Sequence, residues 1–369
     1  RVWKIVKSCI TGYLIKQSYI KSNKNRLYNW KNISVEVSLP TFNAKDYIEI
    51  RNIGSSSLSS VSLIYHIEKE ELFALKKFFK STENEKLFKR ECHNYSYLNF
   101  PFIPKFIGET NEKDGIIIEF INGKILSRAK NLEFGDKLSI ICELLVTVMY
   151  LHKNQFIYRD LKPNNIMIDH NNDIVLIDFD RMIHLPNISE DEPTTNDFTE
   201  YSDPLITTDE LSYKNDIYSL GKIISYLIKN DLETELMNKE ENFKLKINEI
   251  IRKCTSLKEQ RPTINDLFYE FFNSIDMFSI INKDKLIDYL LLAANLNDVK
   301  SQCKLGCIYD SGQYIARNID KAIHFFTLSA NKNNAISLHN LGVIYLKGED
   351  IPKNIQKAIH YFSLASDQN

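Results

Sequence analysis

The C-terminal part of the chain repeats with a fixed period of 36 residues. Each unit carries a Leu-Gly pair, an Asn-Ile pair and a Lys-Ala-Ile triplet. They occur at Leu305-Gly306 and Leu341-Gly342, Asn318-Ile319 and Asn354-Ile355, Lys321-Ala322-Ile323 and Lys357-Ala358-Ile359. Such a period is typical of a solenoid of stacked helical hairpins, because one hairpin cannot bury its apolar face alone. The repeat therefore predicts an all-α helical-hairpin solenoid over residues 285–369.

The repeat array contains two full units and one leading half-unit at Leu292-Ala293-Ala294, and its last helix carries Ile359, Phe362 and Leu364. A terminal unit needs a polar cap, and no capping helix follows this one. We therefore expect its apolar face to be covered by further repeats, by the preceding domain or by another protein. We assign residues 285–369 to the binding of a protein partner. The alternative is that the repeats only stabilise the preceding domain.

Length and composition bound the rest of the chain. The 369 residues allow about two domains plus an extension, and 43% hydrophobic with 26% charged residues is typical of a globular protein. A net charge of −1 gives no overall field that would attract nucleic acid. The longest apolar stretch, Ile140 to Leu151, is too short to cross a bilayer, so we expect no transmembrane segment. Six scattered cysteines favour buried thiols in a reducing, cytoplasmic compartment.

Residues 1–45 form a basic N-terminal extension that we leave unassigned. Apolar residues at helical spacing predict a helix over residues 2–15, which could lie on a membrane surface or dock on protein. Alternating apolar residues predict a strand over residues 33–39. Further along, the patterns predict strands between residues 47 and 79, helices over 83–98 and 134–152, and a long loop over 185–200.

The strongest chemical signal is the run from Tyr158 to Asn165, followed thirteen residues later by Asp178-Phe179-Asp180. Phosphoryl transfer needs a carboxylate that orients the attacking hydroxyl and accepts its proton, and Asp160 would supply it. Lys162 would offset the charge on the transferring phosphoryl group. Asn165 and Asp178 offer the amide and carboxylate oxygens that hold Mg²⁺ against phosphates.

With these motifs, residues 46–275 resemble a eukaryotic-type protein kinase domain, whose signature also includes a Gly-rich loop, a strand Lys and a helix Glu. The resemblance implies an α+β, two-lobed fold that binds ATP and Mg²⁺ and phosphorylates a protein substrate. It implies that Lys76 binds the nucleotide phosphates and pairs with Glu91. Ile118 would lie at the back of the adenine pocket. The other implied nucleotide-binding residues are Ile53, Gly54, Ser56, Val61, Ala74, Glu119, Ile121 and Met167, with residues 119–121 as the hinge.

Further segments extend the resemblance. Residues 214–221 resemble the large-lobe helix whose Asp, here Asp216, braces the catalytic loop. Lys162, two positions after Asp160, resembles the lysine of Ser/Thr-directed kinases. The C-terminal units are similar to Sel-one-like repeats, a branch of the tetratricopeptide-like superfamily. Together these features imply a kinase that carries its own interaction module.

The sequence departs from the family pattern at three places. The nucleotide loop has Ser56 and Ser59 where the family has glycines that let backbone amides approach phosphates, so we expect weaker ATP affinity. Asp180 replaces the glycine of D-F-G. Residues 203–205 read Asp-Pro-Leu where A-P-E is expected, so Arg261 is expected to lose its Glu partner and to need a substitute, Asp209 or Glu210.

Two functions therefore stay open. The six groups that would contact phosphate, metal or the transferred proton are all present, namely Lys76, Glu91, Asp160, Lys162, Asn165 and Asp178. Their presence favours an active protein serine/threonine kinase whose repeats recruit partners. The alternative is a pseudokinase scaffold that binds nucleotide weakly or not at all and acts through protein–protein interaction.

Overall fold

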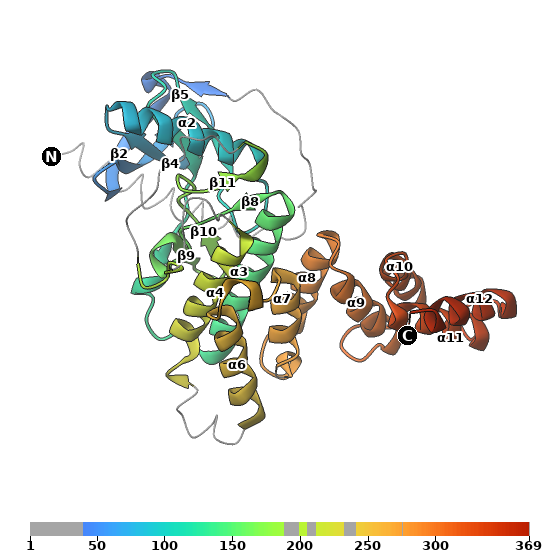
Figure 1. Cartoon of the computed structure of the whole chain (residues 1–369). Helices are drawn as coiled ribbons and strands as arrows, with labels where there is room; N and C mark the ends of the chain where they lie inside the picture. Colours follow the sequence, from blue (N-terminus) through green and yellow to red (C-terminus); the bar gives the residue numbers. More distant parts are fainter. Residues whose placement is uncertain (1–39, 188–198, 205–211, 232–240, 275, 369) are drawn as a thin grey trace. The chain divides into compact units, whose positions relative to one another are not determined.

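The computed structural model describes residues 40–187, 199–204, 212–231, 241–274 and 276–368 (Figure 1). The helix predicted over residues 2–15, the strand over 33–39 and most of the loop over 185–200 lie outside the described residues. The chain divides into two compact units. The first contains the described parts of residues 1–132, 154–227 and 254–261, and the second contains those of 133–153, 228–253 and 262–369.

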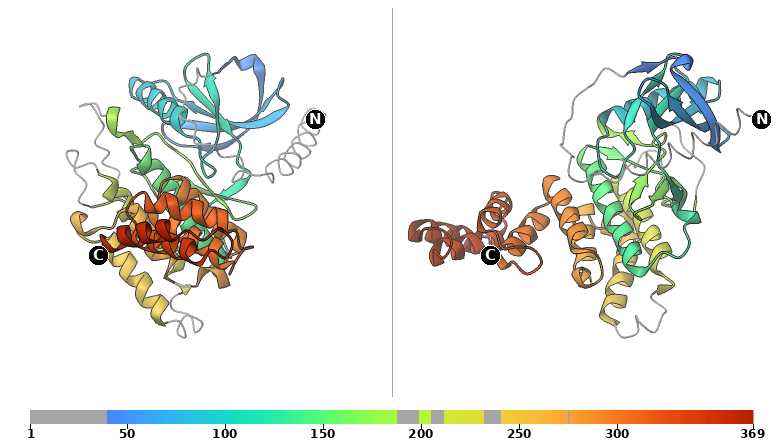
Figure 2. Two further views of the ribbon diagram at one scale, coloured as in Figure 1. Left: turned by 90° about the vertical axis from the view of Figure 1, so that its right-hand side faces the viewer. Right: turned by 180° about the vertical axis from the view of Figure 1, so that it is seen from behind.

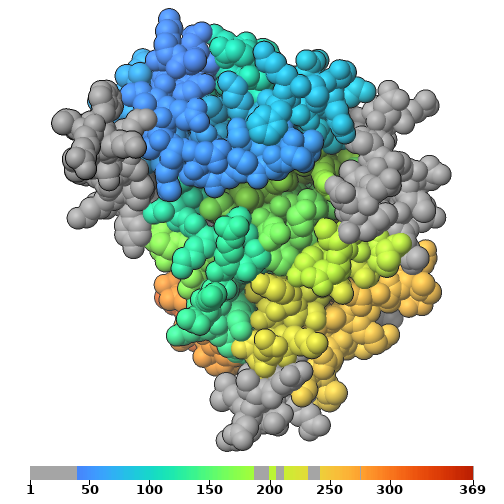
Figure 3. All heavy atoms as spheres, turned by 90° about the vertical axis from the view of Figure 1, so that its left-hand side faces the viewer, coloured from blue at the N-terminus to red at the C-terminus, as the bar shows by residue number. Residues whose placement is uncertain are grey.

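A six-stranded sheet dominates the first unit, with the strand order β1-β5-β6-β4-β3-β2. Its strands are β1 (Thr41–Phe42), β2 (Tyr47–Ser55), β3 (Ser59–His66), β4 (Glu71–Phe78), β5 (Phe106–Thr110) and β6 (Gly115–Glu119). Only β1 and β5 pair in parallel; the other neighbours are antiparallel. The strands predicted between residues 47 and 79 are therefore confirmed. The outer strand β2 is largely exposed, and Figure 3 shows this blue part of the chain at the surface.

The two faces of the sheet have different compositions. One face buries an apolar cluster of Phe42, Ile64, Phe73, Leu75 and Ile117. Side chains alternate between faces along a strand, and directly paired residues share a face. The register places a different set on the opposite face, because Gly54 pairs with Val61, Val61 with Lys76, and Ala74 with Ile118. This second face carries five of the candidate nucleotide-binding residues, namely Gly54, Val61, Ala74, Lys76 and Ile118.

Helix α2 (Thr82–Tyr97) packs beside the sheet and confirms the helix predicted over residues 83–98. Ser81 caps its N-terminus by accepting a hydrogen bond from the Asn84 amide at 3.1 Å. Phe88, Cys92 and Tyr95, spaced at i, i+4 and i+7, are buried and fix which side of the helix faces inward. The same side carries Glu91, only 1% exposed.

Smaller elements complete the first unit. They are the three-stranded sheet β10-β9-β7 (Ile174–Leu176, Ile166–Asp169, Gly123–Ile125), the pair β8 (Phe156–Ile157) and β11 (Ile183–His184), and most of helix α4 (Tyr213–Ile228).

Arg261 lacks the Glu partner of the family pattern, as expected, but its substitute is not one of the two carboxylates that we expected. Arg261 and Asp203 form a bidentate pair at 2.5 and 3.1 Å, with both side chains only 1% exposed. Asp203 thus supplies the carboxylate that we expected from Asp209 or Glu210, which lie outside the described residues. The carboxylate of Asp203 lies two positions before Leu205, where the family has Glu, and it binds the same buried guanidinium.

The second unit is helical. Its helices are α3 (Phe134–Lys153), most of α6 (Glu241–Cys254), α7 (Ile264–Phe272), α8 (Lys283–Asn295), α9 (Val299–Ser311), α10 (Ile319–Ala330), α11 (Ala335–Lys347) and α12 (Ile355–Ser366). The buried helix α3 confirms the helix predicted over residues 134–152, and it contacts α7 and α8. Tyr289 of α8 donates a hydrogen bond to the buried Glu143 of α3 at 2.5 Å.

The repeats form as the period predicts. Each helix from α8 to α11 packs against the next helix along the chain (Figure 2). Asn318 and Asn354 cap α10 and α12 in the same way, each accepting a backbone amide at 2.9 Å. A Cβ on Gly306 would lie 2.5 Å from the Phe326 ring, and one on Gly342 would lie 2.7 Å from the Phe362 ring. Glycine at these positions therefore lets each helix pack directly on the aromatic ring of its hairpin partner.

The apolar face of α12 stays open in the described part of the chain. Ile355, Ile359 and Leu364 are 55%, 61% and 36% exposed. In α10, one period earlier, Phe326 is fully buried, whereas its counterpart Phe362 is only partly buried. The cover that we expected for this face is thus not supplied by the described residues.

Five of the six cysteines lie among the described residues, and all five are free thiols. Four of them are buried (Cys92, Cys142, Cys254 and Cys303), as the sequence predicted. The cytoplasmic location inferred from them stays a prediction. Within the described residues, no helix combines the length and the apolar character needed to cross a membrane.

Candidate active site

The segment after β8 places Asp160, Lys162 and Asn165 in one hydrogen-bonded group. Lys162 Nζ lies 2.8 Å from each carboxylate oxygen of Asp160. Asn165 Nδ2 donates to the same carboxylate at 2.8 Å and to the Asp160 carbonyl at 3.0 Å. Asp160 is 8% exposed, and these hydrogen bonds fix the orientation of its carboxylate.

Asp216 of α4 binds the backbone of this segment. Its two carboxylate oxygens accept the backbone N–H groups of Tyr158 and Arg159, each at 2.9 Å. The side chain is fully buried, so the two bonds are made in a low-dielectric setting where they are strong. Arg159 has a positive φ of 71°, a strained backbone conformation that these bonds help to maintain. The predicted bracing role of Asp216 is confirmed.

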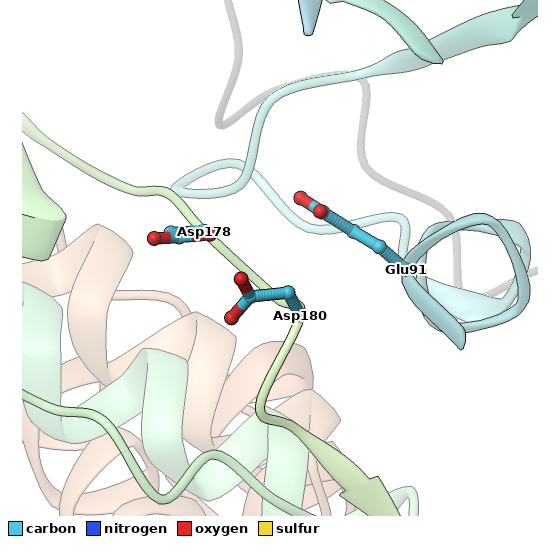
Figure 4. A group of neighbouring side chains, drawn as sticks. All are labelled: Glu91, Asp178 and Asp180. Carbon is cyan, nitrogen blue, oxygen red and sulfur yellow. The ribbon is translucent and has the colours of Figure 1, made fainter. Parts of the chain in front are cut away.

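Lys76 lies among three carboxylates. Its Nζ is 2.7 Å from Glu91, 2.6 Å from Asp178 and 3.9 Å from Asp180. Figure 4 shows Glu91 reaching from its helix toward the segment that carries both aspartates. The predicted Lys76–Glu91 pair is confirmed. The Lys76 side chain is only 11% exposed.

Burial and neighbouring charges both shift the pKa values of these four groups. Burial raises the pKa of Glu91 to about 7, although Lys76 opposes the shift. Burial would lower the pKa of Lys76, but Asp178 and Glu91 outweigh it and hold that pKa well above its usual range. Burial also opposes ionisation of Asp178, yet Lys76 keeps its pKa below normal. Burial and the Asp178 charge raise the pKa of Asp180. Asp178 and Lys76 are thus held charged together.

Two residues of α2 that the sequence did not single out fix the Asp178–Asp180 segment. Arg90 Nε donates to the Asp180 carbonyl at 2.5 Å. Asn94 Nδ2 donates to the carbonyls of Phe179 and Met182, each at 2.9 Å. Both lie on the helix that carries Glu91, at positions 90 and 94, one turn apart. That spacing was the only available signal, and it is common on helices.

The candidate metal ligands Asn165 and Asp178 are brought together by the backbone, because the Ile177 amide donates to the Asn165 carbonyl at 2.9 Å. The Asn165 side-chain nitrogen Nδ2 donates to Asp160, so the side-chain oxygen Oδ1 is the Asn165 atom that would bind a cation. An amide oxygen and a carboxylate are the hard oxygen ligands that Mg²⁺ prefers, so this pair fits the ion. Glu91, Asp178 and Asp180 also offer oxygens within 4.8 Å of one another.

The remaining predicted residues divide between two sheets. Gly54, Val61, Ala74, Lys76 and Ile118 share one face of the six-stranded sheet through direct strand pairing. The neighbouring Ile53 is 40% exposed on β2, and Ser56 lies in the turn after it.

The hinge begins with Glu119, the last residue of β6. The Glu119 N–H donates to the Lys105 carbonyl at 2.9 Å, and Ile121 is 8% exposed. Met167 lies on β9 of the three-stranded sheet, where it pairs with Ile125 and Val175.

Comparison with known proteins agrees with this geometry. A family model described as protein kinase domain matches residues 47–292, well over half of the chain. The chain belongs to the protein kinase family. The Sel1 repeat model matches residues 299–334 and 335–369. The predicted fold, an α+β kinase domain followed by a helical-repeat array, is therefore confirmed.

Curated relatives match this chain at low identity. A probable serine/threonine-protein kinase of Dictyostelium discoideum is 32% identical over 41% of this chain and 24% of its own length. The serine/threonine-protein kinase SCH9 of Candida albicans is 28% identical, over 60% and 30% respectively. The serine/threonine-protein kinase PrkC of Bacillus subtilis is 27% identical, over 49% and 30%. The chain spans under a third of the length of these three relatives.

Proposed function

We propose that this protein transfers the γ-phosphoryl group of ATP to serine or threonine hydroxyls of protein substrates. One observation carries the proposal: all six chemically essential side chains lie in two connected hydrogen-bonded groups. Lys76, Glu91 and Asp178 form one group, and Asp160, Lys162 and Asn165 form the other. The Ile177–Asn165 backbone bond joins the two groups at 2.9 Å.

Each residue has a defined task in this mechanism. Asp160, oriented by Lys162 and Asn165, accepts the proton of the attacking hydroxyl. Lys162, now bound to Asp160, offsets negative charge on the group in transfer. Lys76 is held by Glu91 and binds nucleotide phosphates. Mg²⁺, when bound by Asn165 and Asp178, neutralises charge on the phosphates.

The preference for serine and threonine rests on Lys162 two positions after Asp160, and on relatives whose names specify serine/threonine kinases. The pseudokinase alternative is favoured by a different observation: in the serine-rich turn between β2 and β3, the Ser56 hydroxyl oxygen accepts hydrogen bonds from two backbone amides. Transfer of phosphate to a generic substrate separates the two functions.

The decisive experiment measures transfer of radiolabelled phosphate by the wild-type chain and by Lys76→Met and Asp178→Asn. Each variant is expected to lose at least about 100-fold in turnover, since each removes a charge that acts on the phosphates or their metal. Lys77→Met is the matched control, because Lys77 is the adjacent lysine and is 49% exposed. Wild-type turnover in either variant would mean that the assignment of that residue is wrong.

Folding must be checked in the same samples, because the buried Glu91 loses its cation in Lys76→Met. Circular dichroism and thermal unfolding provide that check. If the wild-type chain binds Mg·ATP but transfers no phosphate to any substrate, the pseudokinase function replaces the kinase function.

We also propose that the repeats recruit a protein partner or substrate. Support comes from the open apolar face of α12, where Ile355 and Ile359 are 55% and 61% exposed. Deleting residues 313–369 is expected to leave activity on a short peptide intact and to reduce phosphorylation of a protein substrate. If peptide activity is lost as well, the repeats are part of the catalytic unit.

A further inference from the structure

The turn between β2 and β3 contains a network centred on Ser56. The Ser56 Oγ accepts hydrogen bonds from the backbone amides of Leu58 at 3.2 Å and Ser59 at 3.1 Å. The Ser56 amide in turn donates to the Ser59 carbonyl at 2.8 Å, which closes the turn. Two backbone donors at the tip of the turn are therefore satisfied by a side chain of the same turn.

Those two donors are the kind of group that a phosphate needs. Consecutive backbone N–H groups in a tight turn form a partly positive concavity that attracts anions. Where a glycine occupies the central position, no side chain competes for these donors and the phosphate can approach the backbone. The Ser56 hydroxyl oxygen is an acceptor held three bonds from its own backbone, so it reaches the amides without any loss of translational freedom.

The tip of the turn is also held from outside. The Leu58 carbonyl accepts the Phe79 amide at 2.9 Å and Asn84 Nδ2 at 3.3 Å. Asn84 is 5% exposed in the first turn of α2, and its Nδ2 also donates to the Phe79 carbonyl at 2.8 Å. The turn is thus tied to the helix that carries Glu91. Because these contacts fix the backbone, the Leu58 and Ser59 amides become available mainly through rotation of the Ser56 side chain.

We propose that the Ser56 hydroxyl is an internal ligand of the phosphate-binding turn, which a nucleotide phosphate must displace, and that it sets the phosphate selectivity of this site. The proposal rests on the proposed function, in which this face of the sheet binds ATP. The adenosine part of the nucleotide does not compete with Ser56. The wild-type protein therefore gains little affinity from the phosphates, and it prefers ATP to adenosine less than it would without the hydroxyl.

The test measures dissociation constants of Mg·ATP and adenosine for the full chain by isothermal titration calorimetry. Ser56→Ala removes the hydroxyl without adding the backbone freedom of glycine. It is expected to bind Mg·ATP about tenfold more tightly than wild type, the equivalent of one to two intramolecular hydrogen bonds that no longer need to be broken. Adenosine affinity is expected to stay within about twofold. Ser57→Ala, the same change at the exposed neighbouring position, is the control and should leave both constants near the wild-type values.

Each other outcome overturns a distinct statement. If Ser56→Ala binds Mg·ATP no better than Ser57→Ala, the displacement idea is wrong while nucleotide binding stands. If Ser56→Ala binds Mg·ATP more weakly, the hydroxyl shapes the turn for phosphate rather than blocking it, which also refutes the proposal. If none of the three proteins binds ATP or adenosine, both the inference and the proposed function fail.

Discussion

Substitution of Asp203 by Asn tests the buried Arg261–Asp203 ion pair, which the sequence did not predict. Asp203 neutralises Arg261 through two hydrogen bonds at 2.5 and 3.1 Å, and both side chains are 1% exposed. Asn has the same shape, so the change removes the charge without opening a cavity. A buried guanidinium is then left without its counterion.

The expected cost follows from what Arg261 keeps. Removing one member of a buried ion pair typically costs about 3–5 kcal/mol. Arg261 still donates to the carbonyls of Ser256 and Lys214, at 2.9 and 3.0 Å, and lies over the ring of Tyr218. We therefore expect the lower limit, about 3 kcal/mol. For a domain of roughly 150–250 residues this corresponds to a fall in melting temperature of about 6–12 °C.

The assay is calorimetric unfolding together with urea denaturation of the full chain. Glu249→Gln is the matched control, because it removes the partner of Arg252 in a surface pair on α6, whose Arg and Glu side chains are 68% and 44% exposed, and should leave the melting temperature unchanged. The double variant Asp203→Leu/Arg261→Met should recover most of the lost stability, since it removes both charges. A melting temperature of Asp203→Asn equal to that of Glu249→Gln would show that Arg261 does not depend on Asp203.

Two further predictions concern α8. Burial and the Asp284 charge raise the pKa of Asp288 to about 6. The folded state thus binds this proton more tightly than the unfolded state, and stability falls as the pH rises from about 4 to 6. Allowing for solvent screening, Asp288→Asn should stabilise the protein by up to about 1 kcal/mol at pH 7 and should have no effect below pH 4. Urea titrations at both pH values measure the difference. Tyr289→Phe removes the donor to buried Glu143 and should lower the free energy of unfolding by about 1–3 kcal/mol. Tyr269→Phe, at an exposed site on α7, is the control and should cause no change. Equal stability of the two variants would contradict this prediction.

The resemblance to the kinase family predicted the Lys76–Glu91 pair, and the period of the repeats predicted the C-terminal helices. Lys76 and Glu91 lie fifteen positions apart, on a strand and on the helix that follows it, and the folded chain brings the two side chains together. The 36-residue period predicted the helices, and the Asn caps and glycines at equivalent positions formed the same contacts twice. These features succeed because each depends on neighbours close in sequence or on an exact repetition. The catalytic roles of the site residues and the domain boundaries stay predictions.

The features that the sequence missed all depend on which of several equivalent side chains reaches a distant group. Asp209 and Glu210 were the partners that the sequence suggested for Arg261, whereas the folded chain pairs it with Asp203, which the sequence did not single out for this role. Arg90 and Asn94 looked like ordinary helix residues until the Asp178–Asp180 segment was placed beside them. Ser56 was recognised as a replaced glycine, but the direction of its hydroxyl depends on the side-chain rotamer, which the sequence does not specify.

Helix α8 shows why the kinase domain and the repeats are structurally continuous. By the 36-residue period it is the second helix of a leading half-unit, yet the kinase family model ends at residue 292, inside the same helix. Its buried side chains include Leu286, Tyr289 and Leu290, and it contacts both α3 and α9. The first repeat therefore stacks on a helix that already belongs to the helical unit containing α3, which supplies the cap that the start of a solenoid needs. A truncation at residue 285 would cut α8 and expose α3, whereas removal of residues 313–369 leaves that interface whole. Only the second deletion can separate recruitment by the repeats from stability of the kinase.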